Sequence, residues 1–387
     1  MFEIMEVTSQ EAVLKVVGVG GCGGNAVDHM IANGVKGVEF ICANTDMQAL
    51  KRTQARTQLQ LGANVTKGLG AGADPGVGRQ AALEDREHIA ELLAGTDMLF
   101  LTAGMGGGTG TGAAPVVAEI ARELGILTVA VVTRPFAFEG KRQKVAQEGL
   151  DALAQLVNSL IVVPNDKLMQ VLGNQVTLDE AFRAANEVLH GAVAGIAEII
   201  SCPGMINVDF ADVKTVMSET GVALMGSAKA VGTDRARMAA EQAVACPLLE
   251  DIDMNDARGV LINISASKES LQLQEVYDAM DVVKAYAADT ASPIIGTVYD
   301  DELGDELRVT IVATGLGKTH ARMQPKPLTV VMPATGTDGA PVSGPVNYEE
   351  LDQPAVMRRN RNQTVEAMRQ SGVEMLDIPA FLRKQAD

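Results

Sequence analysis

Short apolar runs recur along the first half of the chain, and each is followed by a glycine-rich or polar segment with helical spacing. The first run, VLKVVGV from Val13, leads through GGCGG into NAVDHMIANG, which is the order strand, glycine turn, helix. Further strand-like runs occupy residues 39–43, 98–102, 126–133 and 160–163. Because strands that alternate with helices favour parallel pairing, this pattern predicts an α/β fold with a parallel sheet covered by helices.

A long amphipathic helix is predicted in the middle of the chain. Its pattern covers residues 177–200 and stops at Cys202, Pro203 and Gly204, which end helices well. Helical and strand-like patterns then resume, with helices at 235–245 and 271–288 and strands at 260–265, 294–299 and 307–314. The sequence therefore predicts a second α/β domain after the central helix.

Beyond Gly317 the composition shifts to Pro, Gly, Thr, Gln and Asn without apolar periodicity, which predicts a disordered linker. The chain ends on MLDIPAFLRKQAD, where Asp377 suits a helix start and Phe381 with Leu382 could enter a hydrophobic groove. An ordinary frayed terminus is the alternative. The predicted divisions are an extension at 1–12, domains at 13–176 and 203–317, the helix at 177–202, the linker at 318–373 and a tail at 374–387.

Charge and cysteine content narrow the function classes. The 387 residues carry 32 Lys plus Arg against 49 Asp plus Glu, a formal charge of -17, so a nucleic acid backbone would be repelled. Four cysteines without a CxxC pair indicate a reducing cytoplasm, and the dispersed histidines predict no metal-binding site. No signal-peptide pattern or run of about 18 apolar residues occurs, so no direct membrane insertion is expected.

Two glycine loops carry the candidate chemistry. Residues 18–23 fit G-x-G-x-x-G between a strand and a helix, where amides and the helix dipole can receive phosphate. Alone, this loop also fits a turn that serves packing, or a dinucleotide-binding domain with Asp46 as a ribose ligand. A second loop at 103–112, AGMGGGTGTG, again joins a strand to a helix. Since ordering so many glycines is costly, two such loops indicate several phosphates and argue against the dinucleotide alternative.

Several motifs together resemble the FtsZ family of tubulin-like GTPases. They are GVGGCGGNAV, NTD at 44–46, GLGAGADP, GGGTGTG at 106–112, RPFAFEGKR, PND at 164–166, NVDFADV and the C-terminal LDIPAFLRKQAD. The resemblance implies a Rossmann-like GTPase domain and a second α/β domain joined by a long central helix. It also implies a cytoplasmic division protein that forms head-to-tail protofilaments in the mid-cell ring, and that binds FtsA- and ZipA-like membrane tethers through residues 375–387.

The resemblance also implies which residues surround GTP or GDP. Phosphates would lie against two loops, formed by Gly20, Gly21, Cys22, Gly23 and Gly24 and by Gly104, Gly106, Gly107, Gly108, Thr109 and Gly110. The γ-phosphate would meet Asn44, Asp46, Ala71, Gly72 and Ala73. The ribose and phosphates would meet Thr133, Pro135, Glu139 and Arg142, and guanine would meet Asn25, Asn165, Phe182 and Glu187. Mg²⁺ would be held by the phosphates rather than by a protein cage.

The chain departs from the family pattern at a few of these positions. Cys22 replaces a glycine, which requires a negative φ there. Asp74 replaces an asparagine and adds a negative charge near the γ-phosphate loop, while Glu187 replaces an aspartate and keeps a carboxylate for guanine. One residue is missing from the RPFAFEGKR segment, which leaves Lys141, Arg142 and Lys144 as candidates for the nucleotide contact.

An acidic loop precedes a helical stretch at residues 207–212, NVDFAD. The i, i+3 spacing of Asp209 and Asp212 puts both carboxylates on one side of a first helical turn. From the residues alone, simple helix capping by Asp209 explains the spacing equally well. The resemblance implies instead that Asn207, Asp209 and Asp212 enter the nucleotide pocket of the next subunit and orient the attacking water, so that hydrolysis depends on assembly.

Overall fold

The computed structural model describes residues 12–173, 176–202, 204–219, 221–246, 257–286 and 292–316. The predicted linker and partner-binding tail lie outside the described residues, as does nearly all of the predicted N-terminal extension.

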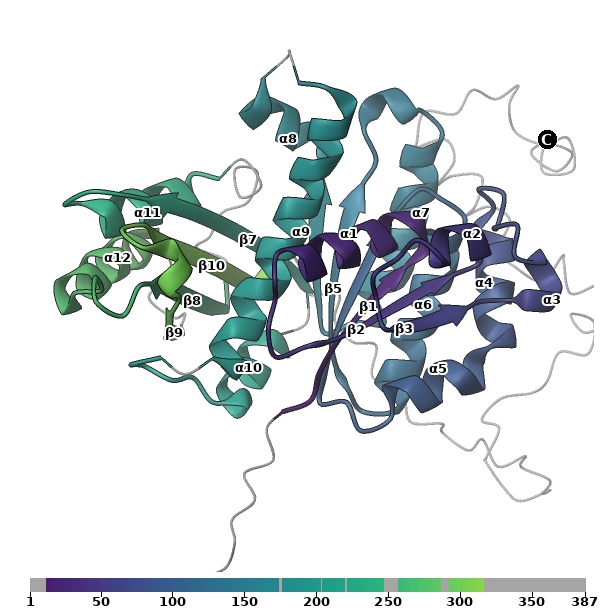
Figure 1. The fold of residues 1–387 in the computed structure, drawn as a ribbon, viewed down its shortest axis with the longest axis horizontal. Coiled ribbons are helices and arrows are strands. Elements are labelled where there is room, and N and C mark those ends of the chain that lie inside the picture. The colour runs from purple at the N-terminus through teal and green to yellow at the C-terminus, as the bar shows by residue number, and fades with distance from the viewer. Residues whose placement is uncertain are drawn as a thin grey trace, which may run out of the picture. The chain divides into compact units, whose positions relative to one another are not determined.

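The N-terminal half is built on six parallel strands (Figure 1). They are β1 (Leu14–Val19), β2 (Glu39–Asn44), β3 (Thr57–Gln60), β4 (Met98–Gly104), β5 (Leu127–Arg134) and β6 (Ser159–Pro164). Their order in the sheet is β3-β2-β1-β4-β5-β6. The central strands are buried on both faces, which explains their continuous apolar runs and confirms the predicted parallel sheet.

Alternate side chains of each strand point to opposite faces of the sheet and build two cores. Val16 and Phe100 pack in one core with α1 (Gly20–Ala32), whereas Val17 and Leu101 pack in the other with α6 (Thr109–Glu123). The remaining helices of this half are α2 (Met47–Leu50), α3 (Ala63–Thr66), α4 (Pro75–Glu84), α5 (Arg86–Leu93), α7 (Arg142–Ala154) and α8 (Asn165–Leu172). The sheet is therefore the middle of three layers.

The predicted central helix is confirmed as α9 (Leu178–Ser201). Thr177 caps it through a capping box, because its hydroxyl accepts from Glu180 N while the Glu180 carboxylate accepts from Thr177 N. Buried positions recur every fourth residue at first and become continuous from Ala192 to Ala197. The second half of α9 is thus enclosed on all sides, as Figure 1 shows by its course between the two halves of the fold.

The C-terminal half continues the same sheet. Its elements are α10 (Phe210–Met217), β7 (Gly221–Ala230), α11 (Arg235–Val244), β8 (Gly259–Ala266), α12 (Leu273–Tyr286), β9 (Ser292–Tyr299) and β10 (Leu307–Leu316). The sheet order runs on as β6-β7-β10-β8-β9, with β7 joined to β6 in parallel and to β10 in antiparallel pairing. The second α/β domain is confirmed, and it shares one ten-stranded sheet with the first.

Two predicted details are corrected by the structure. The first helix was expected to begin near Asn25, but α1 begins at Gly20, so the glycine loop itself forms the first helical turn. The strands β3 and β7 were not predicted, because short or small-residue segments such as GVALMGSAKA lack the β-branched alternation that marks strands. Hydrogen bonds to the neighbouring strands of the sheet, rather than their own sequences, make these two segments strands.

A buried ion pair fastens the C-terminal half together. Arg235 Nε donates to Glu275 Oε1 at 2.6 Å, and the other guanidinium nitrogens reach the carbonyl oxygens of Asp305 and Ser270. The exposed fractions of the two side chains are 7% and 11%. The start of α11 is thereby tied to the start of α12 and to the turn before β10.

We expect Glu275→Ala to lower the free energy of unfolding by about 3–5 kcal/mol, because the Arg235 guanidinium would stay buried without its counter-ion. Urea unfolding followed by circular dichroism measures this loss. The control is Glu241→Ala, which removes the exposed Arg237–Glu241 pair and should leave the free energy of unfolding nearly unchanged. Equal losses in the two variants would contradict the prediction.

Candidate nucleotide site

Two helix N-termini meet at one cavity of about 260 Å³. The helix α1 starts at Gly20 and α6 follows Gly108, and neither has a side-chain cap or an acidic residue in its first turn. Their first amide groups therefore have no helical partner and carry the positive end of the helix dipole. The cavity is lined by Gly20, Gly21, Cys22, Gly104, Met105, Gly107, Gly108, Thr109 and Gly110, among others. Such an arrangement suits a phosphate chain.

The glycines of these loops serve two different purposes. A Cβ on Gly20 would lie 3.0 Å from Gly110 N, so Gly20 lets the first loop approach the second. A Cβ on Gly110 would lie 2.5 Å from Gly104 O, so Gly110 lets the second loop fold closely on itself. At Gly21 and Gly107, by contrast, a Cβ would meet nothing within 4 Å. Close packing therefore explains more of these glycines than the sequence predicted. Gly21 and Gly107 leave room for a ligand instead.

A third loop, Ala71 to Asp74, lies against the second glycine loop. A Cβ on Gly108 would come within 2.9 Å of Ala71 Cβ and 2.8 Å of Asp74 N. Ala73 has a φ of 62°, a left-handed conformation that is uncommon for alanine. Asp74 caps α4 by accepting from Gly76 N, so its extra carboxylate has a structural role at the helix start.

Asn44 and Asp46 hold the neighbouring turn in shape. Asn44 Oδ1 accepts from Asp46 N, and the Asp46 carboxylate caps α2 by accepting from Gln48 N. Between them, Thr45 contributes a contact that the sequence analysis missed, since its hydroxyl oxygen lies 2.6 Å from that of Thr109. This contact joins the second glycine loop to the turn after β2. No periodicity in the sequence signals a bond between two separate loops.

The wall expected at the ribose comes from the end of β5 and the turn after it. Thr133, Pro135, Glu139 and Arg142 all line the cavity. Arg142 Nη1 donates to Glu139 Oε2 at 2.7 Å, and the other carboxylate oxygen of Glu139 accepts from Phe136 N.

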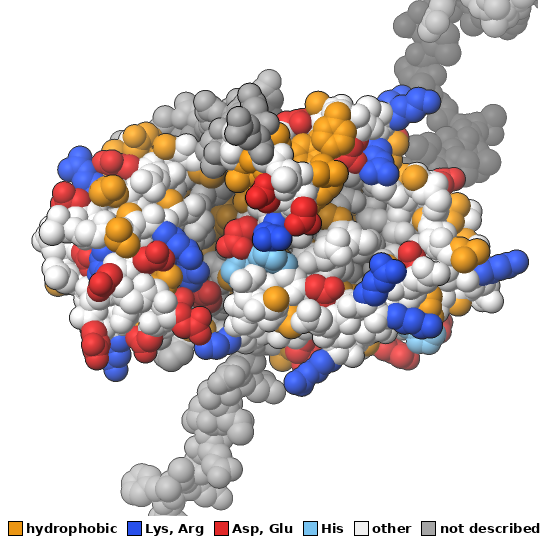
Figure 2. Space-filling view, turned by 45° about the horizontal axis from the view of Figure 1, so that its top comes forward, with side chains coloured by type: hydrophobic (Ala, Val, Ile, Leu, Met, Phe, Trp, Pro, Cys, Tyr) orange, Lys and Arg blue, Asp and Glu red, His pale blue; other side chains and the backbone are white. Residues whose placement is uncertain are grey.

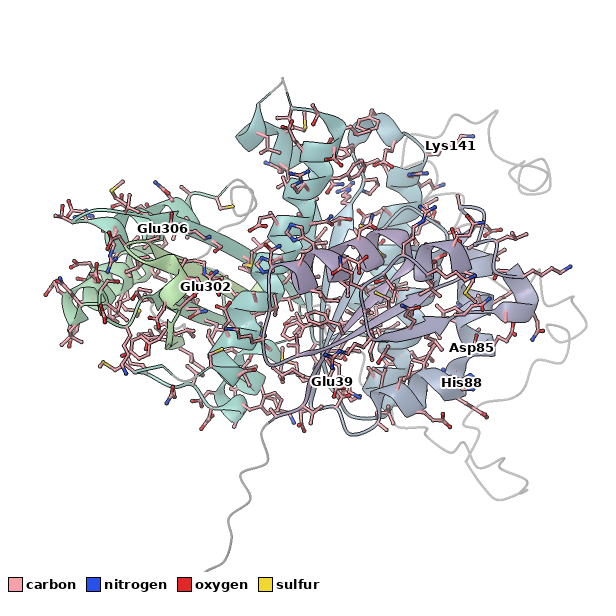
Figure 3. The ribbon with its side chains drawn as sticks, in the orientation of Figure 1. Glu39, Asp85, His88, Lys141, Glu302 and Glu306 are labelled. Carbon is pink, nitrogen blue, oxygen red and sulfur yellow. The ribbon has the colours of Figure 1, made fainter. Side chains whose placement is uncertain are left out.

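Of the three basic candidates for the nucleotide contact, Arg142 is the one that lines the cavity. Lys144 lies 4.0 Å from Glu148, and Figure 3 shows Lys141 pointing away from the fold. The structure therefore favours Arg142 over the two lysines.

The far end of the cavity contains an unpaired acceptor. Asn165, the first residue of α8, is only 4% exposed, and its Oδ1 has no hydrogen-bond partner among the described residues. An acceptor buried in this way is costly unless a ligand donates to it. Phe182 lines the same end of the cavity, with its ring 5.5 Å from that of Phe136. A flat base with N–H donors fits these surroundings.

Some predicted residues lie outside the cavity lining. Gly23 is packed under the loop, where a Cβ would lie 2.5 Å from Thr102 O, and Gly24 and Asn25 follow it on α1. The other predicted residues outside the lining are Asn44, Asp46, Ala71, Gly72, Ala73, Gly106 and Glu187. The carboxylate of Glu187 lies against two histidines of α1 and α9. The roles predicted for Asn25 and Glu187 at the base stay predictions.

Cys22 fits its position in the first loop. Its φ is not positive, and this is the backbone condition that a residue other than glycine requires at this position. Its Sγ lies 3.6 Å from Thr133 Oγ1, beside Gly104. Burial raises the pKa of the Cys22 thiol, the bond to Thr133 opposes this, and the charge of Glu139 adds to it. The thiol is therefore mostly protonated at neutral pH.

The acidic loop lies at the other end of α9. Asp209 caps α10, since its Oδ1 accepts from Asp212 N at 2.9 Å, and Asn207 Oδ1 accepts from Gly204 N. All three predicted catalytic side chains are exposed. The capping alternative is thus confirmed for Asp209, and none of the three residues lines the cavity.

Two features are absent from the described residues. They contain no group of three or more His, Cys, Asp or Glu side chains arranged to hold a metal ion. Among the helices that the structure describes, none is long and apolar enough to cross a membrane.

Comparison with known proteins identifies the class to which this fold and cavity belong. Residues 13–173 match the model of the Tubulin/FtsZ family GTPase domain, and residues 221–317 match that of the FtsZ family C-terminal domain. The protein is a tubulin-like GTPase. More narrowly, the chain belongs to the FtsZ family, which confirms the predicted resemblance and excludes the dinucleotide-binding alternative.

Curated relatives and solved structures agree with this assignment. The cell division protein FtsZ of Coxiella burnetii is 57% identical over 389 residues, with 99% of each chain covered, and that of Pseudomonas aeruginosa is 56% identical with 100% of each covered. An FtsZ dimer structure from M. jannaschii is 42% identical and superimposes with a TM-score of 0.76, covering 80% of this chain and 89% of that one.

We expect bound GDP to slow alkylation of Cys22 by about tenfold or more, because the nucleotide would cover a thiol that reacts only as its thiolate. Without nucleotide, raising the pH from 7 to 9 should speed the reaction, since burial has raised the pKa of this thiol. Peptide mass spectrometry measures the rate. Cys202, which follows the last residue of α9, is the internal control and should not respond to GDP. Equal protection of both cysteines would contradict the site.

Proposed function

We propose that this chain binds GTP in the cavity between α1 and α6 and hydrolyses it against the acidic loop of a second subunit. The observation that supports this most directly is the separation of the two parts within one chain. The cavity includes Phe182 near the start of α9, whereas Asn207, Asp209 and Asp212 follow its end. One subunit therefore holds the nucleotide and another supplies the acids.

The length of α9 supports this arrangement. A helix of 24 residues is about 36 Å long at 1.5 Å per residue. The continuous burial from Ala192 to Ala197 prevents this helix from bending to bring its ends together. A head-to-tail contact between two copies can unite them. Because such a contact is heterologous and does not close, it generates filaments.

The acids are suited to positioning a water molecule. The hydrogen bond from Asp212 N engages one oxygen of Asp209 and fixes its orientation, while the Asp212 carboxylate is exposed at the loop surface. Phosphoryl transfer depends mainly on positioning and on compensating charge, so two oriented carboxylates near the γ-phosphate are sufficient protein groups for this role. Mg²⁺ bound to the phosphates would supply the charge compensation, in keeping with its preference for phosphate oxygens and water.

This assembly would act in cell division. The relatives are named cell division proteins, and one related solved structure is a dimer, which supports self-association of this chain. We infer that its protofilaments form a ring in the cytoplasm at mid-cell. Residues 375–387 would attach the ring to FtsA- and ZipA-like membrane tethers through a linker of about 55 residues, whose r.m.s. reach is about 40 Å.

Mixing two inactive variants tests the shared site. Asp212→Ala keeps the cavity but should lower the GTPase rate by about 100-fold or more. Gly107→Asp keeps the acidic loop but should repel the phosphates, and a side chain at Gly107 meets nothing within 4 Å, so the fold should survive. In an equal mixture, about a quarter of random interfaces pair an intact cavity with intact acids. GTPase activity, measured by phosphate release, should therefore reappear.

Gly107 is preferable to Gly108 for this experiment, because a Cβ at Gly108 would displace the loop at Ala71 to Asp74. Total protein is kept equal throughout, since activity depends on association as well as on chemistry. Co-sedimentation verifies that the two variants assemble together. No recovery despite co-assembly, or full activity of dilute Asp212→Ala, would overturn the shared site.

Truncation after Gly372 should leave GTP-dependent assembly nearly unchanged, because the cavity and the acidic loop both lie before residue 317. The same truncation should abolish binding to the membrane tethers. Light scattering after GTP addition measures the first effect, and pull-down with a purified tether measures the second.

A synthetic peptide of residues 375–387 is the matching control, and it should compete for the tether without inhibiting assembly. If the truncated chain no longer assembles, the prediction that the tail binds tethers without supporting assembly is wrong.

A further inference from the structure

Two threonine hydroxyls meet where the nucleotide cavity borders the turn after β2. Thr45 Oγ1 lies 2.6 Å from Thr109 Oγ1. Thr109 is the first residue of α6 and lines the cavity, whereas Thr45 is 0% exposed and does not line it. A nucleotide in the cavity can therefore touch Thr109 but not Thr45. Any effect of the Thr45 hydroxyl on the nucleotide has to pass through its partner.

Thr109 lies where the two helix N-termini meet. It follows Gly107 and Gly108 in the second glycine loop, and a Cβ on Gly20 of α1 would come within 3.3 Å of Thr109 Cβ. The unpaired amides at the starts of α1 and α6 favour an anion at this place. The Thr109 hydroxyl can add a further hydrogen bond to a phosphate oxygen there.

Net charge does not favour phosphate binding. The chain carries a formal charge of -17, and Figure 2 shows acidic and basic side chains interspersed over one face of the molecule. The groups of the cavity itself therefore have to hold the phosphates, and each donor contributes according to its direction. Threonine in a helix populates two χ1 rotamers. A partner that selects one rotamer of Thr109 thus lowers the entropy cost of binding.

Thr45 is itself held in place by its backbone. Its carbonyl oxygen accepts from Gly70 N and from Thr66 Oγ1, both at 3.3 Å. The next residue, Asp46, pairs with Leu69 in an antiparallel bridge. These contacts fix the backbone of Thr45 against the following loop. Its hydroxyl is therefore presented to its partner from a rigid support.

We propose that Thr45 is a positioning residue for Thr109. In the proposed function, on which this inference rests, the phosphates of GTP lie in the cavity between α1 and α6. A hydroxyl has one proton and can accept two hydrogen bonds, so Thr109 accepts from Thr45 and donates its own proton to a phosphate oxygen. The first bond orients the second and strengthens it by polarisation.

The test measures how strongly the full-length protein prefers GDP to guanosine, which lacks the phosphates. Both affinities are obtained by competition with labelled GDP, and their ratio cancels effects on base and ribose binding. Thr45→Val removes the hydroxyl and keeps the shape of the side chain. The preference should fall about tenfold, the size expected when one hydrogen bond to a charged group is weakened. Thr45→Ser keeps the hydroxyl and should keep the preference.

A double-mutant cycle with Thr109→Val separates positioning from a structural role. Because Thr45 acts through Thr109, the double variant Thr45→Val/Thr109→Val should bind GDP no more weakly than Thr109→Val alone. A purely structural role of Thr45 would add its own loss to that of Thr109→Val.

The matched control is Thr128→Val. Thr128 on β5 is 1% exposed, does not line the cavity, and its hydroxyl donates to Ile126 O at 3.2 Å. This variant also loses a buried hydroxyl and should keep the preference for GDP. Circular dichroism verifies that each variant is folded, and Thr45→Ala provides the same comparison if Thr45→Val does not fold.

The outcomes separate failure of this inference from failure of the proposed function. If the unmodified protein binds GDP and guanosine equally, the phosphates do not lie in the cavity and both fall. If it prefers GDP and Thr45→Val keeps that preference, the positioning role is overturned and the nucleotide site stands. The same follows if Thr109→Val has no effect, if the losses in the cycle add, or if Thr45→Ser loses as much as Thr45→Val.

Discussion

The packing of α9 against both halves of the sheet is the constraint on which the rest of the structure depends. Its residues Leu189, Val193 and Ile196 belong to a core that also contains Val129 of β5 and Val312 of β10. Arg308 of β10 adds a hydrogen bond to Glu198 of α9 at 2.8 Å. Because the helix is held on all sides, it fixes the distance between the nucleotide cavity and the acidic loop. In the proposed shared site, a single subunit would therefore be unable to bring its own acidic loop to its own nucleotide cavity.

The cavity depends on a second constraint, the contact of two backbones. The first turn of α1 comes this close to the start of α6 because Gly20 has no side chain, since a Cβ there would lie 3.0 Å from Gly110 N. That contact directs two sets of unpaired amides to one space, where neither helix alone would bind a phosphate chain strongly. The glycines that build the contact are distinct from those that border the open space. Some glycines of these loops are thus required by packing, and others by the space that a ligand needs.

The sequence was sufficient to predict the features that are local or periodic. The capping residues, the amphipathic pattern of α9 and the paired strand–glycine–helix units predicted the class of fold and the position of the cavity. It was not sufficient for contacts between distant segments, such as the bond of Thr45 to Thr109 or the addition of β7 to β6. The histidine contacts of Glu187 are of the same kind, because side chains of α1 and α9 meet only after the helices pack.

The two interpretations of Asp209 illustrate how local structure and chemistry combine. Capping alone would explain an aspartate before α10, and the hydrogen bond from Asp212 N shows that Asp209 does cap the helix. This bond uses one carboxylate oxygen and fixes the χ angles of the side chain, which leaves the other oxygen in a defined direction. A free side chain on an exposed loop would lose conformational entropy each time it ordered a water molecule. If Asp209 orients the attacking water as proposed, the cap prepares it for that role, since the entropy is already lost when the subunit folds.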